Sequence, residues 1–423
     1  MINYNNIKSV IGTNKRIVWL YNIGVEDFWH GNVFSVKDKS GMKIVNEMED
    51  MNLLIASMND IVIMRNKPSY EYLSYLKNIG FNIPTILKVS GDDDTKNISE
   101  LVLEDQGLLY TLSNLSDDYV LCPYGISEIE EKISEITGLK LIGGTSKLAR
   151  LVNDKIFARE VSQNLGFKTT EGKKCKFDDI ETEINYLFEV KKYKKAIVKV
   201  PCGASGKGLY IIDGKDSIKR TLLILKRFHS NEEYFLVEGW IDNKKDYNYQ
   251  LYVGEDSTKV FSIKEQILDK TIYTGSLFQI DNNIETEILD KGKQIGEYLR
   301  KKFNYNGFLG IDCLTDNGEL VPILEINGRF TLSTYLSFLS AVFGNKFFYS
   351  FYKNVSNLTY NEVVKKLESS KIQYNREIGS GAICYVEGSL QEKGRLFILV
   401  IANSDNEIKE IYNKVIQVLN IGE

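Results

Sequence analysis

A glycine-rich segment, residues 199–208, lies between two apolar, β-branched runs and carries a lysine near each end, Lys199 and Lys207. Glycines let backbone N–H groups approach an anion closely, and the lysines add positive charge, so the segment predicts a phosphate-binding loop. It is not a P-loop, because Gly208 occupies the place of the required hydroxyl residue and Pro201 that of the first glycine. A plain glycine-rich surface turn explains this segment equally well when it is taken alone.

Two carboxylates and an amide gather within residues 307–330, which predict a hairpin turned at the sequence TDNG. A two- or four-residue turn there pairs Asp312 with Ile323. Asp312 then shares a face with Glu325 and Asn327, because side chains alternate along a strand, and Asp312 and Glu325 become diagonal neighbours. Hard oxygen ligands of this kind suit Mg²⁺ held together with substrate phosphates. A three-residue turn would instead place the two carboxylates on opposite faces.

The sequence FLVEGWID places one carboxylate, Glu238, ahead of Trp240 and Ile241. A carboxylate can accept a hydrogen bond from the 6-amino group of adenine while nearby backbone groups read the ring edge, so this segment predicts an adenine-binding hinge. Asp246 is then placed to bind a ribose hydroxyl, and Lys155, at the start of a predicted helix, to contact phosphate. Each of these residues taken singly has an ordinary alternative as an exposed charge or a core aromatic.

Arg329 follows Asn327 on the same predicted face, where a cation would stabilise charge on a transferring phosphoryl group or an acyl intermediate. We expect the substrates to bind close to Arg329. The segment YTGS (273–276) predicts a loop whose backbone donors receive a carboxylate, with an ordinary exposed loop as the alternative. The candidate substrate-binding residues are Arg329, Ser333, Thr334, Thr274, Gly275 and Ser276.

The elements that position these residues change in character along the chain. The first part alternates short apolar runs with helical patterns, which predicts an α/β domain with a mainly parallel sheet. From about residue 170, longer strands separated by charged turns predict antiparallel pairing. The predicted strands of the first part are 16–21, 60–66 and 118–125, and the predicted helices of the chain include 69–80, 127–138, 145–167, 216–230 and 284–303.

The composition is that of an ordinary globular protein, with 43% hydrophobic and 26% charged residues. A net charge of -4 gives no general attraction to nucleic acid or to anionic membranes. No apolar run is long enough to span a membrane, and the five scattered cysteines predict reduced thiols in a cytoplasmic protein. With only two histidines, His30 and His229, histidine-based metal binding and acid–base catalysis are not expected.

Taken in chain order, the segments NDKIFAREVSQNLGF, IVKVPCGASGKGLYIID, LVEGWID, GIDC and EINGR resemble the ATP-grasp ligases. The resemblance covers about residues 145–335 and implies ATP and Mg²⁺ as cofactors. It implies that Asp312, Glu325 and Asn327 bind the metal and that Arg329, Lys199 and Lys207 are catalytic. The implied nucleotide-binding residues are Lys155, Lys199, Gly203, Ser205, Gly206, Lys207, Glu238, Trp240, Ile241 and Asp246.

The implied fold is α/β, with α+β character in the nucleotide clamp. We expect an N-terminal domain over residues 1–144, an ATP-grasp domain over 145–350 with a flap subdomain at about 170–245, and a small C-terminal unit over 351–423. The N-terminal region is similar to the pre-ATP-grasp domain of a natural-product branch of the family. The C-terminal unit is expected either to cap the site or to form a homodimer contact.

The resemblance implies that a carboxylic or amino acid is activated as an acyl phosphate, with release of ADP, and then captured by an amine to form an amide or peptide bond. One alternative is transfer to the phosphopantetheine thiol of a carrier protein, and another is a nucleotide-binding regulator without turnover. The expected partners are therefore small carboxylates and amines or a carrier protein, without nucleic acid or membrane.

Overall fold

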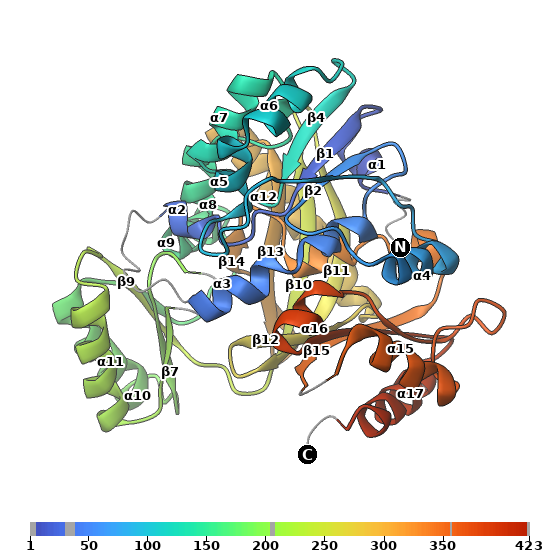
Figure 1. Cartoon of the computed structure of the whole chain (residues 1–423). Coiled ribbons are helices and arrows are strands. Elements are labelled where there is room, and N and C mark those ends of the chain that lie inside the picture. Colours follow the sequence, from blue (N-terminus) through green and yellow to red (C-terminus); the bar gives the residue numbers. More distant parts are fainter. Residues whose placement is uncertain (1–5, 30–38, 204–207, 356–357, 421–423) are drawn as a thin grey trace.

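The computed structural model describes residues 6–29, 39–203, 208–355 and 358–420. Its N-terminal domain holds a sheet of five parallel strands in the order β3-β2-β1-β4-β5 (Figure 1). Strand β2 is buried along its whole length, and β1 and β4 are buried except at their first residue, as expected for a parallel sheet covered by helices. The strands are β1 (Arg16–Leu20), β2 (Ile61–Met64), β3 (Thr85–Lys88), β4 (Tyr119–Pro123) and β5 (Lys140–Leu141).

Two helices of this domain agree with the predicted ranges 69–80 and 127–138. Ser69 and Gly80 bound α4, and Ser127 and Gly138 bound α7, each through side-chain capping at the start and a left-handed glycine at the end. The helices here are α1 (Ile7–Ile11), α2 (Glu26–Trp29), α3 (Lys39–Asn46), the 3-10 helix η1 (Glu49–Leu54), α4 (Tyr70–Ile79), α5 (Ile98–Glu104), α6 (Gln106–Ser113) and α7 (Glu128–Thr137).

The predicted single helix over 145–167 is wrong, because the chain forms two helices, α8 (Ser146–Val152) and α9 (Lys155–Asn164). The side chain of Asp154 accepts hydrogen bonds from the N–H groups of Ile156 and Phe157, which is N-cap geometry in the middle of the predicted helix. The break places Lys155 in the first turn of α9.

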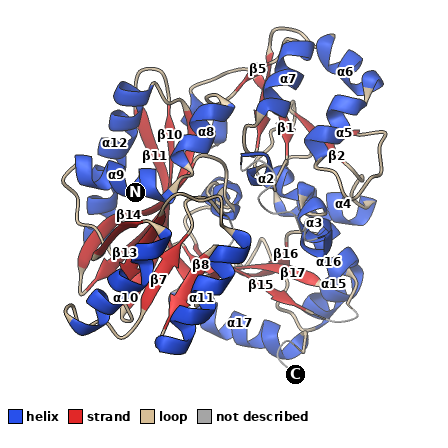
Figure 2. Ribbon diagram, turned by 90° about the vertical axis from the view of Figure 1, so that its left-hand side faces the viewer, coloured by secondary structure: helices blue, strands red, loops and turns tan. Residues whose placement is uncertain are grey.

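The flap subdomain is an antiparallel sheet in the order β6-β9-β7-β8, which stands apart from the rest of the molecule (Figure 1). Helix α10 packs on β9 and α11 on β8, so both helices cover one face of this sheet (Figure 2). Its elements are β6 (Gly172–Cys175), the 3-10 helix η2 (Phe177–Asp179), α10 (Ile180–Glu189), β7 (Ala196–Lys199), β8 (Leu209–Ile212), α11 (Lys215–Phe228) and β9 (Phe235–Gly239).

The largest sheet has eight antiparallel strands in the order β14-β13-β10-β11-β12-β15-β17-β16. Three of these strands belong to the C-terminal part, and the predicted boundary between residues 350 and 351 falls inside β15. The strands are β10 (Lys244–Val253), β11 (Thr258–Asp269), β12 (Ile272–Leu277), β13 (Gly307–Asp316), β14 (Glu319–Asn327), β15 (Phe347–Asn354), β16 (Gly381–Cys384) and β17 (Arg395–Ala402).

The remaining helices cover this sheet. Helix α12 packs on β10, β11 and β14, α9 packs on β14, and α17 packs on β15 and β17. These helices are α12 (Asn282–Phe303), α13 (Leu332–Tyr335), α14 (Leu339–Phe343), α15 (Tyr360–Ser369), α16 (Gly388–Lys393) and α17 (Asp405–Val418).

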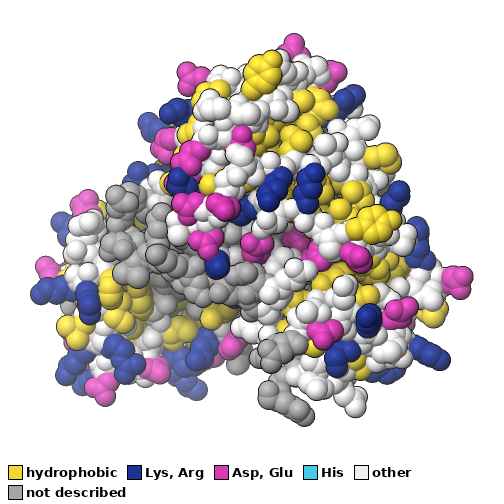
Figure 3. All heavy atoms as spheres, viewed as in Figure 1, with side chains coloured by type: hydrophobic (Ala, Val, Ile, Leu, Met, Phe, Trp, Pro, Cys, Tyr) yellow, Lys and Arg dark blue, Asp and Glu magenta, His cyan; other side chains and the backbone are white. Residues whose placement is uncertain are grey.

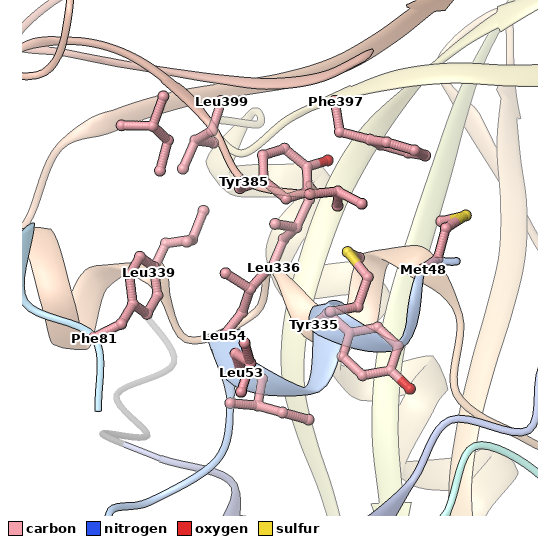
Figure 4. Packing of buried hydrophobic residues seen from close by; sticks show 14 of the residues in the cluster. Met48, Leu53, Leu54, Phe81, Tyr335, Leu336, Leu339, Tyr385, Phe397 and Leu399 are labelled. Atoms are coloured by element: carbon pink, nitrogen blue, oxygen red, sulfur yellow. The ribbon is translucent and has the colours of Figure 1, made fainter. Parts of the chain in front are cut away.

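One hydrophobic core joins the N-terminal domain to the C-terminal strands. Figure 4 shows side chains from three parts of the chain in a single packed group: Met48, Leu53, Leu54, Phe81, Tyr335, Leu336, Leu339, Tyr385, Phe397 and Leu399. Because these parts share a core, the C-terminal strands are held against the same region of the molecule as the N-terminal domain.

The surface carries both signs of charge, with lysine and arginine side chains interspersed among acidic ones over the face in Figure 3.

All five cysteines are free thiols, four of them buried. Within the described ranges, every helix is too short or too polar to cross a bilayer.

Candidate active site

A cavity of about 440 Å³ lies where the flap subdomain, the large sheet, the N-terminal domain and the C-terminal strands meet. The predicted hinge, the predicted metal ligands and Arg329 all line it. The cavity therefore brings the predicted hinge, the predicted metal ligands and Arg329 together at one site.

The hairpin β13–β14 turns through two residues, Asn317 and Gly318, both with positive φ, as the sequence TDNG predicts. Near the turn, Leu314 pairs with Val321 as expected. The predicted pairing of Asp312 with Ile323 is wrong, because Asp312 lies directly opposite Glu325. We call Asp312 and Glu325 the acid pair.

Pro322 accounts for this shift in register. It has no backbone N–H to donate to the ladder, and the pairing is irregular between Asp312 and Leu314, on the strand facing it. The irregularity inserts an even number of residues, so the predicted face is kept: Asp312 and Glu325 still meet on one side.

The acid pair is surrounded by amide groups. Asp312 accepts hydrogen bonds from Asn248 at 2.8 Å, Gln266 at 3.1 Å and Asn327 at 3.2 Å. Burial, together with the neighbouring carboxylate of Glu325, raises the pKa of Asp312 to about 6. Two carboxylates facing each other in a buried site fit a hard divalent cation, and their donor set of carboxylate and amide oxygens suits Mg²⁺.

Lys155 connects the acid pair to the glycine-rich loop. Its side chain is only 1% exposed, and its ammonium lies 3.0 Å from Glu325 and donates to the carbonyl oxygen of Gly203 at 3.0 Å. The start of the loop is thus held over the predicted metal ligands. Ser205, Gly206 and Lys207 lie outside the described residues, so their roles stay predictions.

Glu238 makes different contacts from those predicted for an adenine-binding acid. Its carboxylate lies 2.6 Å from Lys199 and 2.6 Å from Arg159, and it accepts a hydrogen bond from Thr170. Although burial acts to raise it, these two cations hold the pKa of Glu238 below its usual value. Its oxygens therefore bind the protein's own cations in this structure, and Arg159 is a site residue that the sequence analysis missed.

The rest of the hinge lines the cavity as expected. The backbone N–H of Trp240 donates to the carbonyl of Lys195, which leaves the carbonyl and ring of Trp240 to face a ligand. The ammonium of Lys244 lies 5.0 Å from the centre of the Trp240 ring and also pairs with Asp246. Ile241 and Asp246 line the same wall.

Arg329 lines the cavity but is also tied to the N-terminal domain. Its Nε lies 2.5 Å from Glu26, and its Nη1 donates to the hydroxyl of Tyr124 at 2.9 Å. Although burial acts in the opposite direction, the carboxylate of Glu26 raises the pKa of Arg329. The sequence analysis missed both partners, because an acid at the start of a short helix is an ordinary helix feature.

The predicted loop over YTGS is wrong, because residues 272–277 form β12, paired with β11 on one side and β15 on the other. The backbone donors of Gly275 and Ser276 lie within this ladder, and Ser276 is fully buried. Thr274 donates to the carbonyl of Ile267. The geometry of Thr274, Gly275 and Ser276 therefore does not support the predicted carboxylate-binding loop.

Of the two predicted hydroxyls after Arg329, Ser333 lines the cavity, whereas Thr334 is fully buried and donates to Gln250 at 2.6 Å.

Beneath Ser333 lies Lys264, a fully buried lysine that the sequence analysis missed. Its ammonium donates to the carbonyl of Ser333 and to the hydroxyl of Ser337, and burial lowers its pKa well below the ordinary value.

The C-terminal strands add a wall that the sequence analysis did not predict. Tyr352 on β15 and Arg395 and Phe397 on β17 line the cavity, together with Tyr273 on β12. Their contribution depends on β15 and β17 joining the large sheet, a long-range pairing for which no local sequence signal exists.

Residues 152–333 match the family described as an ATP-grasp domain, and residues 48–139 match the family described as a pre ATP-grasp domain. The chain belongs to the ATP-grasp ligases. A third match, over residues 362–415, is to the PGM1 C-terminal domain. An ATP-grasp domain is a nucleotide-binding domain, and the acid pair with Asn327 is the set of residues that fits a divalent metal such as Mg²⁺.

Among its relatives, the ATP-grasp chain is 28% identical over 412 residues to the [Butirosin acyl-carrier protein]--L-glutamate ligase of Niallia circulans, covering 93% of this chain and 92% of the relative. Its fold resembles N5-carboxyaminoimidazole synthetase from Staphylococcus aureus complexed with ADP (TM-score 0.55, 14% identity, covering 98% and 99% of the two chains). It also resembles the biotin carboxylase of Campylobacter jejuni (TM-score 0.55, 12% identity, 96% and 91%).

The cluster around Glu238 predicts a strong dependence of stability on Arg159. Arg159→Met leaves a buried carboxylate with one fewer cation, which should lower the free energy of unfolding by about 3 to 5 kcal/mol. Lys195→Met is the matched control, because Lys195 and Asp242 are both 42% exposed and such pairs contribute about 0 to 1 kcal/mol. Denaturant unfolding of both variants measures this, and equal losses would contradict the role of the cluster.

Lys264 predicts a pH dependence of stability. Because its pKa is lower in the folded than in the unfolded state, the unfolded state binds the proton more tightly, and wild-type stability should rise with pH up to about 10.4, the ordinary lysine pKa. Relative to Lys264→Met, the gain is about 1.4 kcal/mol for each pH unit inside this window. Thermal unfolding from pH 7 to pH 10 measures it. Lys301→Met, whose lysine is 70% exposed, is the control, and parallel curves for all three proteins would refute the prediction.

Proposed function

We propose that this ATP-grasp ligase activates the carboxyl group of a small acid and transfers it to the phosphopantetheine thiol of a carrier protein. The observation that carries the first part is the single cavity in which the hinge, two lysines, the acid pair and Arg329 face one another. The carrier protein is supported by the relative from Niallia circulans, whose name gives an acyl-carrier protein and L-glutamate and whose likeness extends over nearly the whole chain.

The residues of the cavity wall favour activation of the acid by ATP over formation of a covalent acyl-enzyme. Within the described residues, neither cysteine nor histidine lines the cavity. A carboxylate is unreactive toward a thiol, so one of its oxygens is first phosphorylated, which makes that oxygen part of a good leaving group. In the proposed sequence a carboxylate oxygen attacks the γ-phosphorus, the bond to the β-phosphate oxygen breaks, and ADP leaves. The thiol sulfur then attacks the acyl carbon, phosphate leaves, and the thiol proton passes to solvent.

Different side chains of the protein would act in the two steps of this reaction. Lys155 and Lys199 supply positive charge beside the phosphates, and Arg329 supplies it beside the acyl group, so the chain stabilises charge and position rather than bonding to the substrate. When bound, Mg²⁺ would supply positive charge that offsets the charge of the phosphates. The acid pair with Asn327 would hold it. The glycine-rich loop, anchored through Gly203 to Lys155, is placed to keep water from the acyl phosphate.

The acid pair predicts the effect of Glu325→Gln. Loss of one metal-binding charge should cost about 3 to 4 kcal/mol of transition-state stabilisation, which lowers the rate of ADP release by more than two orders of magnitude. Glu319→Gln is a matched control, because Glu319 lies at the other end of the same strand with its side chain 76% exposed. Near-normal turnover in a folded Glu325→Gln protein would contradict the metal assignment.

The acceptor is tested by mixing the protein with ATP, Mg²⁺, an amino-acid panel and a carrier protein in its phosphopantetheine-loaded form. We expect ADP release together with an acylated carrier protein, visible by mass spectrometry and cleaved by hydroxylamine. The same carrier protein without phosphopantetheine is the control and should remain unmodified.

Other products would change the assignment. A hydroxylamine-stable product formed with a free amine would identify the amide-forming reaction that the resemblance first suggested. Release of AMP and pyrophosphate would contradict an acyl phosphate altogether.

A further inference from the structure

Arg395 lies in the cavity wall, and no acid among the described residues forms an ion pair with it. It begins β17, is partly buried and lines the cavity. Its Nε is buried without a hydrogen-bond partner, and no ion pair joins Arg395 to an acid within the described parts of the chain. Other buried arginines differ, because Arg65, Arg159 and Arg329 each lie against a glutamate.

The guanidinium of Arg395 presents a planar fork of donors that matches a carboxylate. A buried cation without a partner is costly, whereas an anion that enters the cavity would satisfy its donors. Among the residues that the structure describes, Arg395 therefore has no acidic partner.

Aromatic side chains shape the space beside Arg395. Its guanidinium lies 5.1 Å from the centre of the Tyr352 ring, and Tyr352 packs against Phe397 at 5.4 Å and against Tyr273 at 6.4 Å between ring centres. The rings hold the guanidinium in place and reduce its contact with water, which strengthens its interaction with an anion. Tyr273 is itself held by Ser276 at 2.9 Å.

We propose that Arg395 binds a second, non-reacting carboxylate of the acid substrate. This inference rests on the proposed function, because it takes the carboxylate beside the acid pair to be the one that is activated. The substrate class is then a dicarboxylic acid or dicarboxylic amino acid, oriented in one cavity with its reacting end at the metal ligands and its other end at β17. The C-terminal strands thereby select the acid.

A carboxylate fits Arg395 better than the other anions of the reaction. The triphosphate has Lys155 and Lys199 on the flap side of the cavity. The phosphate of a phosphopantetheine arm lies at the opposite end of the arm from the thiol. It therefore stays near the carrier protein while the thiol reaches the acyl group.

The test measures the kinetics of ADP release with L-glutamate, L-aspartate and the two mono-amides of each. For the wild type, kcat/KM should fall about 100-fold from the dicarboxylic acid to the amide that keeps the reacting carboxyl group. Arg395→Gln should lose about 100-fold with the dicarboxylic acid and show no further loss with that amide. The KM for ATP and for the carrier protein should remain unchanged.

Two further proteins separate specificity from folding. Arg376→Gln changes an arginine of the same C-terminal unit, which donates to the carbonyl of Asn78, and should behave as wild type. Arg395→Lys keeps the charge but not the fork and should recover only part of the loss. A thermal unfolding temperature close to that of the wild type shows that Arg395→Gln is folded.

Several results would overturn the proposal. These are equal penalties for Arg395→Gln with the acid and the amide, a wild type that prefers monocarboxylic amino acids, or a loss confined to the KM for the carrier protein. Calorimetric titration of the acids into the protein with MgADP separates the two levels of inference. Arg395-dependent binding without ADP release would refute the proposed function alone, and ADP release without dependence on Arg395 would refute this inference alone.

Discussion

The structure of the site depends on placing two carboxylates opposite each other in a buried position. Like charges directly opposite on neighbouring strands repel, and burial intensifies the repulsion, as the raised pKa of Asp312 shows. Three amide side chains donate hydrogen bonds to Asp312, and the buried ammonium of Lys155 forms an ion pair with Glu325. The chain leaves this charge only partly balanced, and a divalent cation with a nucleotide completes it.

The flap side shows the complementary arrangement. Lys199 and Arg159 share a single carboxylate, Glu238, so this cluster, whose Lys199 and Glu238 line the cavity, carries one more positive than negative charge. The two walls therefore carry opposite charges across the space that a metal–nucleotide complex would occupy. Helix α9 supplies both Lys155 and Arg159, which links the two walls and explains why the break at Asp154 matters: it sets the direction in which both cations extend.

Short-range patterns predicted much of this architecture. The two-residue turn at Asn317 and Gly318 was sufficient to place Asp312 and Glu325 on one face, because the side-chain alternation depends only on parity. The direct pairing was missed because the irregularity opposite Pro322 depends on the missing hydrogen-bond donor and on the neighbouring strand. The two-helix break was visible in principle, since Asp154 is a good N-cap, but continuous helical periodicity outweighed it.

Contacts between distant segments were beyond sequence reasoning. YTGS has the glycine and hydroxyl residues of a loop, yet pairing with β11 and β15 makes it a central strand. Glu238 was found by its position in a motif, but its partners Arg159 and Thr170 could be recognised only once α9 was packed beside the flap sheet. The local pattern thus identified the residues of the site better than their partners.

The continuity of the large sheet gives the C-terminal strands their place in the site. Strands β15 and β17 extend the sheet that carries the acid pair, and side chains of both strands pack into the core shared with the N-terminal domain. A cavity wall fixed on both sides in this way can hold an unpaired arginine, because the sheet and the core stabilise the wall independently of that side chain. In the proposed function, the ATP end and the acid end lie on one sheet but come from separate segments of the chain. Substitutions on β15 and β17 can then change the acid without disturbing the nucleotide.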